Sequence, residues 1–72
     1  MNDLDSVAFG VANAGATLLA NAMRDGSLSE QKVIDTSLGC VEVVRARTGV
    51  SIEQAEAALA RATARILDRN CN

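Results

Sequence analysis

The sequence predicts an all-α protein, either a three-helix bundle or a helical hairpin with a third helix, completed by homodimerisation. Two breaks, at residues 25–27 and 48–51, each place a Gly shortly before a Ser that can cap the next helix, which predicts three helices. Of the 72 residues, 13 are Ala, one is Phe and none is Trp or Tyr. Apolar burial at about 25 cal/mol per Å² barely offsets about 1.5 kcal/mol of ordering entropy per residue in so small a chain. We therefore expect self-association to supply the missing stability.

The first helix is expected over residues 3–24, with Asp3 and Asp5 supplying its cap and a favourable N-terminal charge. Residues 6–23 carry no charge, and their few polar residues fall on one stripe at helical spacing, so this helix is expected to be buried on most sides. Two Asn and many Ala and Gly disfavour a membrane span. The acidic residues before the apolar stretch disfavour a signal peptide, so we expect a cytoplasmic protein without a membrane partner.

Small residues at every fourth position characterise this first helix. Ala8, Ala12, Ala16 and Ala20 form a ridge with Gly15 beside it, and such a ridge lets another helix approach closely. The ridge could pack within one chain or against a second copy, and wide apolar surface on a small chain favours the second copy. The residues expected at that contact are Val7, Ala8, Val11, Ala12, Gly15, Leu18 and Leu19.

The second helix is expected over residues 28–48. Ser27-Leu28-Ser29-Glu30 fits a capping box, and the apolar stripe consists of Ile34, Leu38, Val41 and Val44. Residues 41–44 are β-branched enough to form a strand. A helix is favoured because no partner strand exists, and it is expected to bend or cross a neighbour closely at Gly39.

The third helix is expected over residues 52–69, which makes residues 1–72 a single helical domain. Gly49 suits the left-handed position after the second helix, and Ser51 with Gln54 repeats the capping pattern. The stripe expected to be buried consists of Ile52, Ala55, Leu59, Ala62 and Ile66.

The residue inventory disfavours an enzyme and predicts no cofactor or metal. The chain has no His and two Cys, so a zinc site cannot be assembled, and Cys40 and Cys71 allow at most one disulfide. Without His and Tyr, only carboxylates, Lys32 and the thiols remain for acid–base chemistry.

Arginines form the one charge pattern of note. Arg61, Arg65 and Arg69 stand four apart on one face of the third helix, and Arg45 and Arg47 could add to this row. Their guanidinium groups could bind phosphates or carboxylates. The simpler interpretation is a solvated face that complements the helix dipole, and it is favoured because the net charge is −2 and stacking aromatics are missing.

Residues 33–61 contain a family resemblance. Val33-Ile34-Asp35, Gly39, Thr48-Gly49-Val50-Ser51, Ala55, Leu59 and Arg61 resemble the second half of the ANTAR domain. That resemblance implies a three-helix module that binds paired RNA hairpins. In the family a Lys precedes the mid-helix Gly and an aromatic follows the third-helix Ala, whereas this chain has Leu38 and Glu56 there and a longer spacing between Gly39 and Ser51.

We therefore expect a small non-enzymatic regulator, inhibitor or adaptor that binds an unidentified protein partner as a helical homodimer. Its size and its use of Ala and Arg suggest a bacterial or phage origin. The alternative is a regulator that binds RNA or DNA through the arginines of the third helix.

Overall fold

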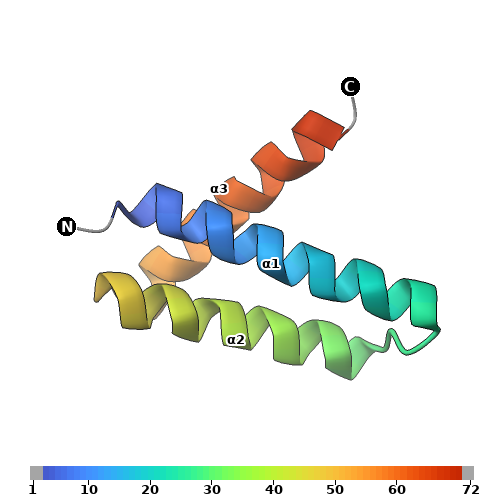
Figure 1. The fold of residues 1–72 in the computed structure, drawn as a ribbon. Helices are drawn as coiled ribbons and strands as arrows, with labels where there is room; N and C mark the ends of the chain where they lie inside the picture. The colour runs from blue at the N-terminus through green and yellow to red at the C-terminus, as the bar shows by residue number, and fades with distance from the viewer. Residues whose placement is uncertain (1–2, 71–72) are drawn as a thin grey trace.

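The protein consists of three helices: α1 (Leu4–Asp25), α2 (Glu30–Thr48) and α3 (Ile52–Asn70). This computed structural model describes residues 3–70, and it contains no strand within them (Figure 1). The predicted all-α fold with three helices is confirmed. Each helix begins and ends within two residues of its expected position, and residues 41–44 belong to α2.

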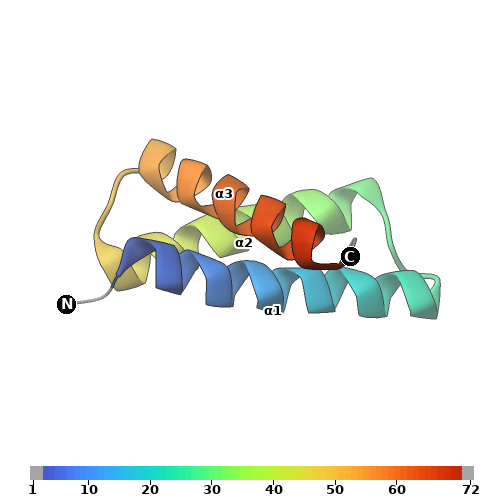
Figure 2. The ribbon, with the colours of Figure 1, turned by 90° about the horizontal axis from the view of Figure 1, so that it is seen from above.

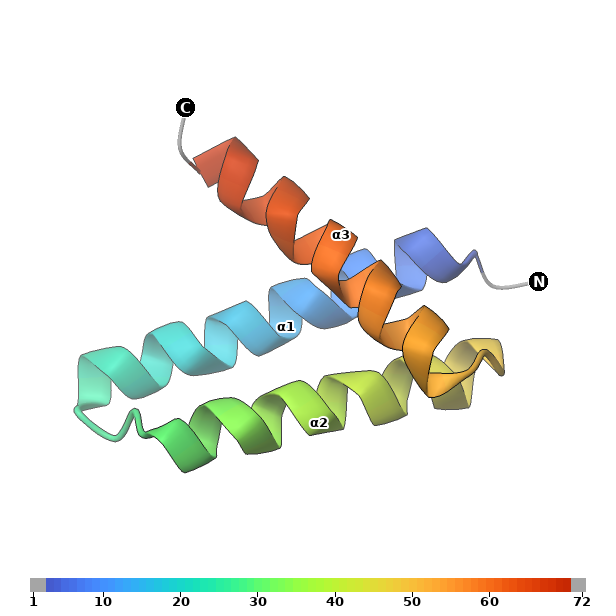
Figure 3. The ribbon, with the colours of Figure 1, turned by 180° about the vertical axis from the view of Figure 1, so that it is seen from behind.

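Helices α1 and α2 form an antiparallel hairpin, and α3 crosses one face of it. Figure 2 shows the first half of α3 lying above α1 and the end of α2, and Figure 3 shows it crossing near the start of α1 and the end of α2. The second half of α3 diverges from the hairpin. The half of the hairpin near the α1–α2 turn therefore has no third helix over it.

The ends of α1 follow from its flanking residues. The Asp3 carboxylate accepts hydrogen bonds from the Asp5 backbone N–H at 3.3 Å and from the Ser6 hydroxyl at 3.0 Å, so the expected Asp3 cap is confirmed. At the other end, Gly26 adopts the left-handed conformation with a φ of 75°. The backbone N–H of Ser27 then donates to the carbonyl of Ala22 at 2.9 Å, which closes the helix as a Schellman motif.

The start of α2 differs from the prediction, because Ser29 and not Ser27 is its cap. The Ser29 hydroxyl accepts a hydrogen bond from the Lys32 backbone N–H at 3.1 Å. Ser27 is already engaged in ending α1, which moves the beginning of α2 by two residues. The sequence pattern could not separate these roles because a Ser at either position can cap a helix.

The connection from α2 to α3 forms as expected. Gly49 has a φ of 75°, and its N–H donates to the Arg45 carbonyl at 2.8 Å. The Ser51 hydroxyl accepts from the Gln54 N–H at 3.2 Å, and Gln54 Oε1 accepts from the Ser51 N–H at 3.2 Å. This reciprocal pair is the predicted capping box.

The core is small and consists mainly of alanine side chains. Among the described residues, Val44 is the only large side chain that is fully buried. The expected stripe of α3 is only partly correct, because Ile52 is 49% exposed and Ala58, which was not expected, is buried. The buried core residues are Ala8, Val11, Ala12, Val44, Ala55, Ala58 and Ala62.

The expectation that the first helix is buried on most sides is wrong. Only one side of α1 is buried, because α2 flanks that side and α3 crosses only the first half of the helix. By length and composition α1 could also cross a membrane, a criterion that core helices and signal sequences meet equally. The buried residues of α1 are Ala8, Val11, Ala12, Gly15 and Ala22.

Helices α1 and α2 approach each other closely at Gly15. A Cβ atom added to Gly15 would lie 2.9 Å from the Cys40 Sγ atom, which is shorter than a normal contact. A Cβ atom on Gly39 would meet nothing within 4 Å. The predicted close crossing at Gly39 is therefore wrong, and Gly39 lies exposed within a continuous α2.

Candidate partner-binding surface

An apolar groove lies between the hairpin and the diverging half of α3. It has a volume of about 430 Å³, and Glu56 is the one charged residue that lines it. Small residues of α1, including Ala12, Gly15 and Ala16, form part of its floor, and Leu19 extends that floor toward the turn. This groove follows from the diverging path of α3, which leaves the hairpin face uncovered.

The apolar surface continues beyond the groove toward the α1–α2 turn. Met23 lies one helical turn after Leu19, and Ile34 and Leu38 lie seven and three residues before Val41, which also lines the groove. Helical periodicity therefore places these side chains on the same side of the hairpin as the groove. Met23 is 67% exposed, Leu38 58% and Ile34 45%. We call this surface the open face and define it as Ala16, Leu19, Met23, Ile34 and Leu38.

The edge of α3 that borders the groove is also apolar. Leu59, Thr63 and Leu67 follow one another at spacings of four residues and line the groove, and Leu67 at its rim is 59% exposed. On the outer side of the same helix, Ala57 and Ala64 are exposed beside the charged Glu53 and Asp68, and Ala60 lies between this side and the groove. Helix α3 thus presents apolar side chains away from the core as well as toward it.

A second depression lies on the opposite face of the hairpin. It has a volume of about 560 Å³, and its lining includes Leu18, Val43 and Gly39. Two charged residues, Asp35 and Arg47, line this depression, compared with one in the groove. It is therefore less uniformly apolar than the groove beneath α3.

The structure divides the residues that the sequence places at an oligomer contact. Ala8, Val11, Ala12 and Gly15 are buried by the chain's own α2 and α3, and Val7 packs against the core. These residues are thus already covered within one copy. Leu19 belongs to the open face, whereas Leu18, which is 56% exposed, lines the depression on the other side.

The sequence reasoning missed the large exposed side chains of the open face. It expected Ile34 and Leu38 to lie on a buried stripe, placed Leu67 at the edge of the buried stripe of the third helix, and counted Met23 among the residues available for the core. An apolar stripe at helical spacing predicts burial without saying what buries it. Nothing in the pattern distinguishes the covered end of the α2 stripe, at Val44, from its uncovered end.

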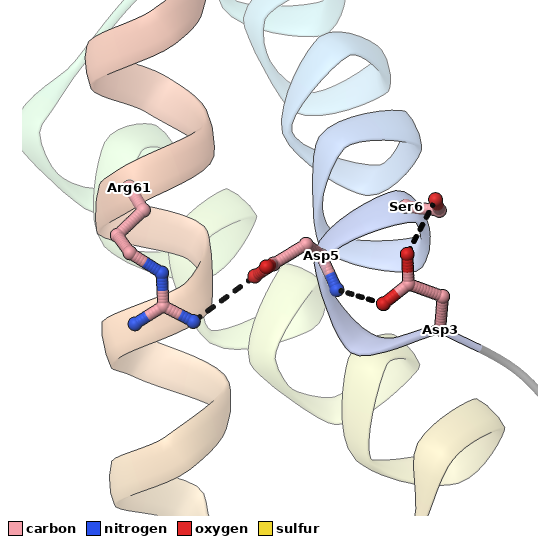
Figure 4. A network of polar contacts seen from close by, with 4 residues as sticks. All are labelled: Asp3, Asp5, Ser6 and Arg61. Carbon is pink, nitrogen blue, oxygen red and sulfur yellow. Dashed lines mark hydrogen bonds and ion pairs between the residues drawn. The ribbon is translucent and has the colours of Figure 1, made fainter.

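Two of the three arginines of α3 contact the start of α1. Arg61 Nη2 lies 3.0 Å from the Asp5 carboxylate in an ion pair (Figure 4). The two side chains are 57% and 60% exposed, so water and salt weaken this pair. The Arg65 guanidinium lies 5.3 Å from the centroid of the Phe9 ring, a cation–π distance.

The remaining arginines do not extend this row into one surface. Arg45 Nε donates to the Val50 carbonyl at 3.3 Å and so supports the α2–α3 connection. Arg47 lines the depression on the opposite face of the hairpin, and Arg69 is exposed near the end of α3. The five arginines are therefore dispersed among four places in the fold.

Cys40 lies where the two depressions approach each other between α1 and α2. Its Sγ atom donates a hydrogen bond to the Val11 carbonyl at 3.8 Å, and burial raises the pKa of the thiol above its ordinary value of 9.0. A protonated thiol is a poor nucleophile, which fits a packing role. Cys71, and with it any bridge to Cys40, lies outside the described residues. Within residues 3–70, no group of three or more Cys, Asp or Glu could hold a metal ion.

Comparisons of the chain with protein-family models, curated proteins and solved structures find no match. The resemblance to the ANTAR domain therefore rests only on the residues named above.

Proposed function

We propose that this protein is a small non-enzymatic cytoplasmic regulator or adaptor that binds another protein and acts as a helical homo-oligomer. The observation that supports the proposal is the open face together with the adjoining groove. Monomeric proteins leave single apolar side chains in water, whereas a contiguous apolar patch usually marks a binding surface.

The composition of the core supports self-association as the source of stability. Val44 is the only large side chain that is fully buried among the described residues, while Met23, Leu38 and Leu67 are each more than half exposed. Burying one such side chain contributes about 1.5–3 kcal/mol. A single copy therefore forgoes several kcal/mol that a binding partner would recover.

The chemistry of the surface supports steric action. The groove is lined mostly by apolar side chains, and burial raises the pKa of the Cys40 thiol above its ordinary value of 9.0. Such a surface binds through shape and apolar area and offers a partner few polar contacts. Regulation would then follow from occupying a partner's surface.

The test is the mass of the protein in solution across a range of concentrations, combined with its melting temperature. An oligomer that gains stability from its contacts melts at a higher temperature as its concentration rises. Sedimentation equilibrium and thermal circular dichroism from micromolar to millimolar concentrations measure both quantities. A constant monomer mass with a constant melting temperature would contradict the self-association.

Nucleic-acid binding through the arginines is the weaker candidate. The arginines are dispersed, and Arg61 and Arg65 already contact Asp5 and Phe9. If the arginines did bind nucleic acid, replacing Arg61, Arg65 and Arg69 by Ala would reduce retention on a heparin column. It would also make nucleic-acid binding less sensitive to salt concentration. We expect unchanged retention.

A further inference from the structure

We infer that the groove and the open face are filled by α3 of a second copy of this chain, in a two-fold dimer whose two α3 helices lie between two hairpins. This inference rests on the proposed self-association and specifies its surface. It assigns the contact to the α3 side of the hairpin and not to the depression behind it.

The first support is the surface area of a single copy. The accessible surface is 5054 Å² for a mass of 7.5 kDa. A compact monomer of this mass exposes about 4,200 Å². A single copy thus exposes more surface than a compact monomer of its mass, and a standard protein interface covers about 800 Å² of each partner.

The shape of the molecule explains where that excess lies. Its extents are 38 × 29 × 17 Å, so it is a flat object of two helical layers. The layer of α1 and α2 is covered only where α3 crosses it, and the rest of its α3-facing side is exposed (Figure 3). A second α3 laid beside the first would cover the exposed part.

The second support is the distribution of side chains on α3. The side of α3 toward its own hairpin is already used by Ala55, Ala58 and Ala62. The neighbouring edge, with Thr63 and Leu67, can contact the partner's α3. Ala60, which lines the groove, and the exposed Ala57 and Ala64 beside it can lie against the partner's hairpin, where small residues permit close helix contact.

The third support is the charge of the two surfaces. None of the five residues of the open face is charged, and only Glu56 lines the groove. A nucleic acid or a highly charged peptide gains little from such a surface. A second copy suits it, because the net charge of −2 per chain repels an identical molecule only weakly.

Charge substitutions at residues of matched exposure test the inference. Leu67→Glu and Leu38→Glu alter the proposed interface, and Leu18→Glu is the control on the other face of the hairpin. The three leucines are 59%, 58% and 56% exposed in a single copy, so each variant should fold equally well. Ala64→Arg adds a fourth variant at an exposed position where Arg is a good helix former.

Sedimentation equilibrium measures the dimer dissociation constant of each variant, and circular dichroism measures its helix content. We expect Leu67→Glu, Leu38→Glu and Ala64→Arg to raise the dissociation constant by about 100-fold or more, because a two-fold interface contains each substitution twice. Leu18→Glu should change it by less than about threefold, within the usual effect of a substitution outside an interface.

The outcomes separate this inference from the proposed function. If the wild type dimerises and all three interface variants dimerise with the same dissociation constant, the inference is overturned while self-association stands. Selective dissociation of Leu18→Glu would also overturn it and would assign the contact to the opposite face. A wild-type chain that stays monomeric would contradict the inference and the proposed self-association together.

Discussion

Single side chains determine how closely α1 and α2 approach each other. Gly15 and Cys40 are in contact because Gly15 has no Cβ atom, and the Cys40 thiol fills the space that a Cβ would occupy. The sequence placed Gly15 on a ridge of small residues but could not identify its partner. That partner lies on another helix, and its position depends on the register of the whole hairpin.

Gly15→Ala and Gly10→Ala form a matched pair that tests this contact. Ala is favoured over Gly in a helix by about 1 kcal/mol, so Gly10→Ala, with nothing within 4 Å of its added Cβ, should stabilise the protein by about that amount. Gly15→Ala should be less stable than Gly10→Ala by about 1 kcal/mol or more, because the Cys40 thiol must move. Urea unfolding measures both, and equal stabilities would show that the two helices do not approach this closely.

The Cys40 thiol gives the protein a pH dependence at alkaline pH. Burial raises its pKa in the folded state above 9.0, so the folded thiol keeps a proton that the unfolded thiol loses. Its contribution to stability is complete below pH 9.0 and decreases as the pH rises through the folded pKa. In a Cys71→Ser background, the free energy of unfolding should fall between pH 8 and about pH 10 by more than in the Cys40→Ala variant. If the free energy of unfolding changed with pH identically in both proteins, the burial of the thiol would be contradicted.

The helix ends show that local sequence specifies an element closely. The Asp3 cap, the left-handed Gly49 and the Ser51–Gln54 box were all predicted, because each depends on residues within one turn of the chain. The start of α2 was misplaced because two serines competed for one role. Which of the two serines caps α2 depends on where α1 ends, because Ser27 takes part in ending α1.

Replacing each of these serines by Ala distinguishes their roles. Ser29→Ala removes the acceptor for the Lys32 N–H and should cost about 1 kcal/mol of stability. Ser27→Ala should cost much less, because its backbone N–H, which the substitution keeps, makes the shorter contact with Ala22. Chemical unfolding of the two variants measures the difference. A larger loss of stability for Ser27→Ala than for Ser29→Ala would show that Ser27 is the cap of α2.

At the scale of the whole molecule, the core has one large side chain that is fully buried among residues 3–70, that of Val44. Val44 is fully buried where all three helices meet, and the residues around it are mainly alanines. Small neighbours bring the helix axes close together but contribute little area each. Stability is therefore concentrated at one end of the hairpin, and the other end depends on what covers it.

Val44→Ala should destabilise the protein by about 2 kcal/mol, from lost transfer energy and a residual cavity. Val43→Ala is the matched control. The Val43 side chain, next to Val44 in the sequence, is 40% exposed, so its truncation should cost less than about 1 kcal/mol. Thermal unfolding at one fixed protein concentration compares the two. Equal losses would mean that the core is not centred on Val44.

The sequence by itself determined the number of helices, their ends to within two residues and the stripe of each helix that is apolar, because these properties depend on neighbours along the chain. Only the tertiary structure decided which part of each stripe is covered. The direction of α3 across the hairpin buries Val44 and leaves Ile34 and Leu38 exposed on the same stripe. A crossing angle results from the fit of three surfaces at once, and no local pattern encodes it. The open face follows from that one angle.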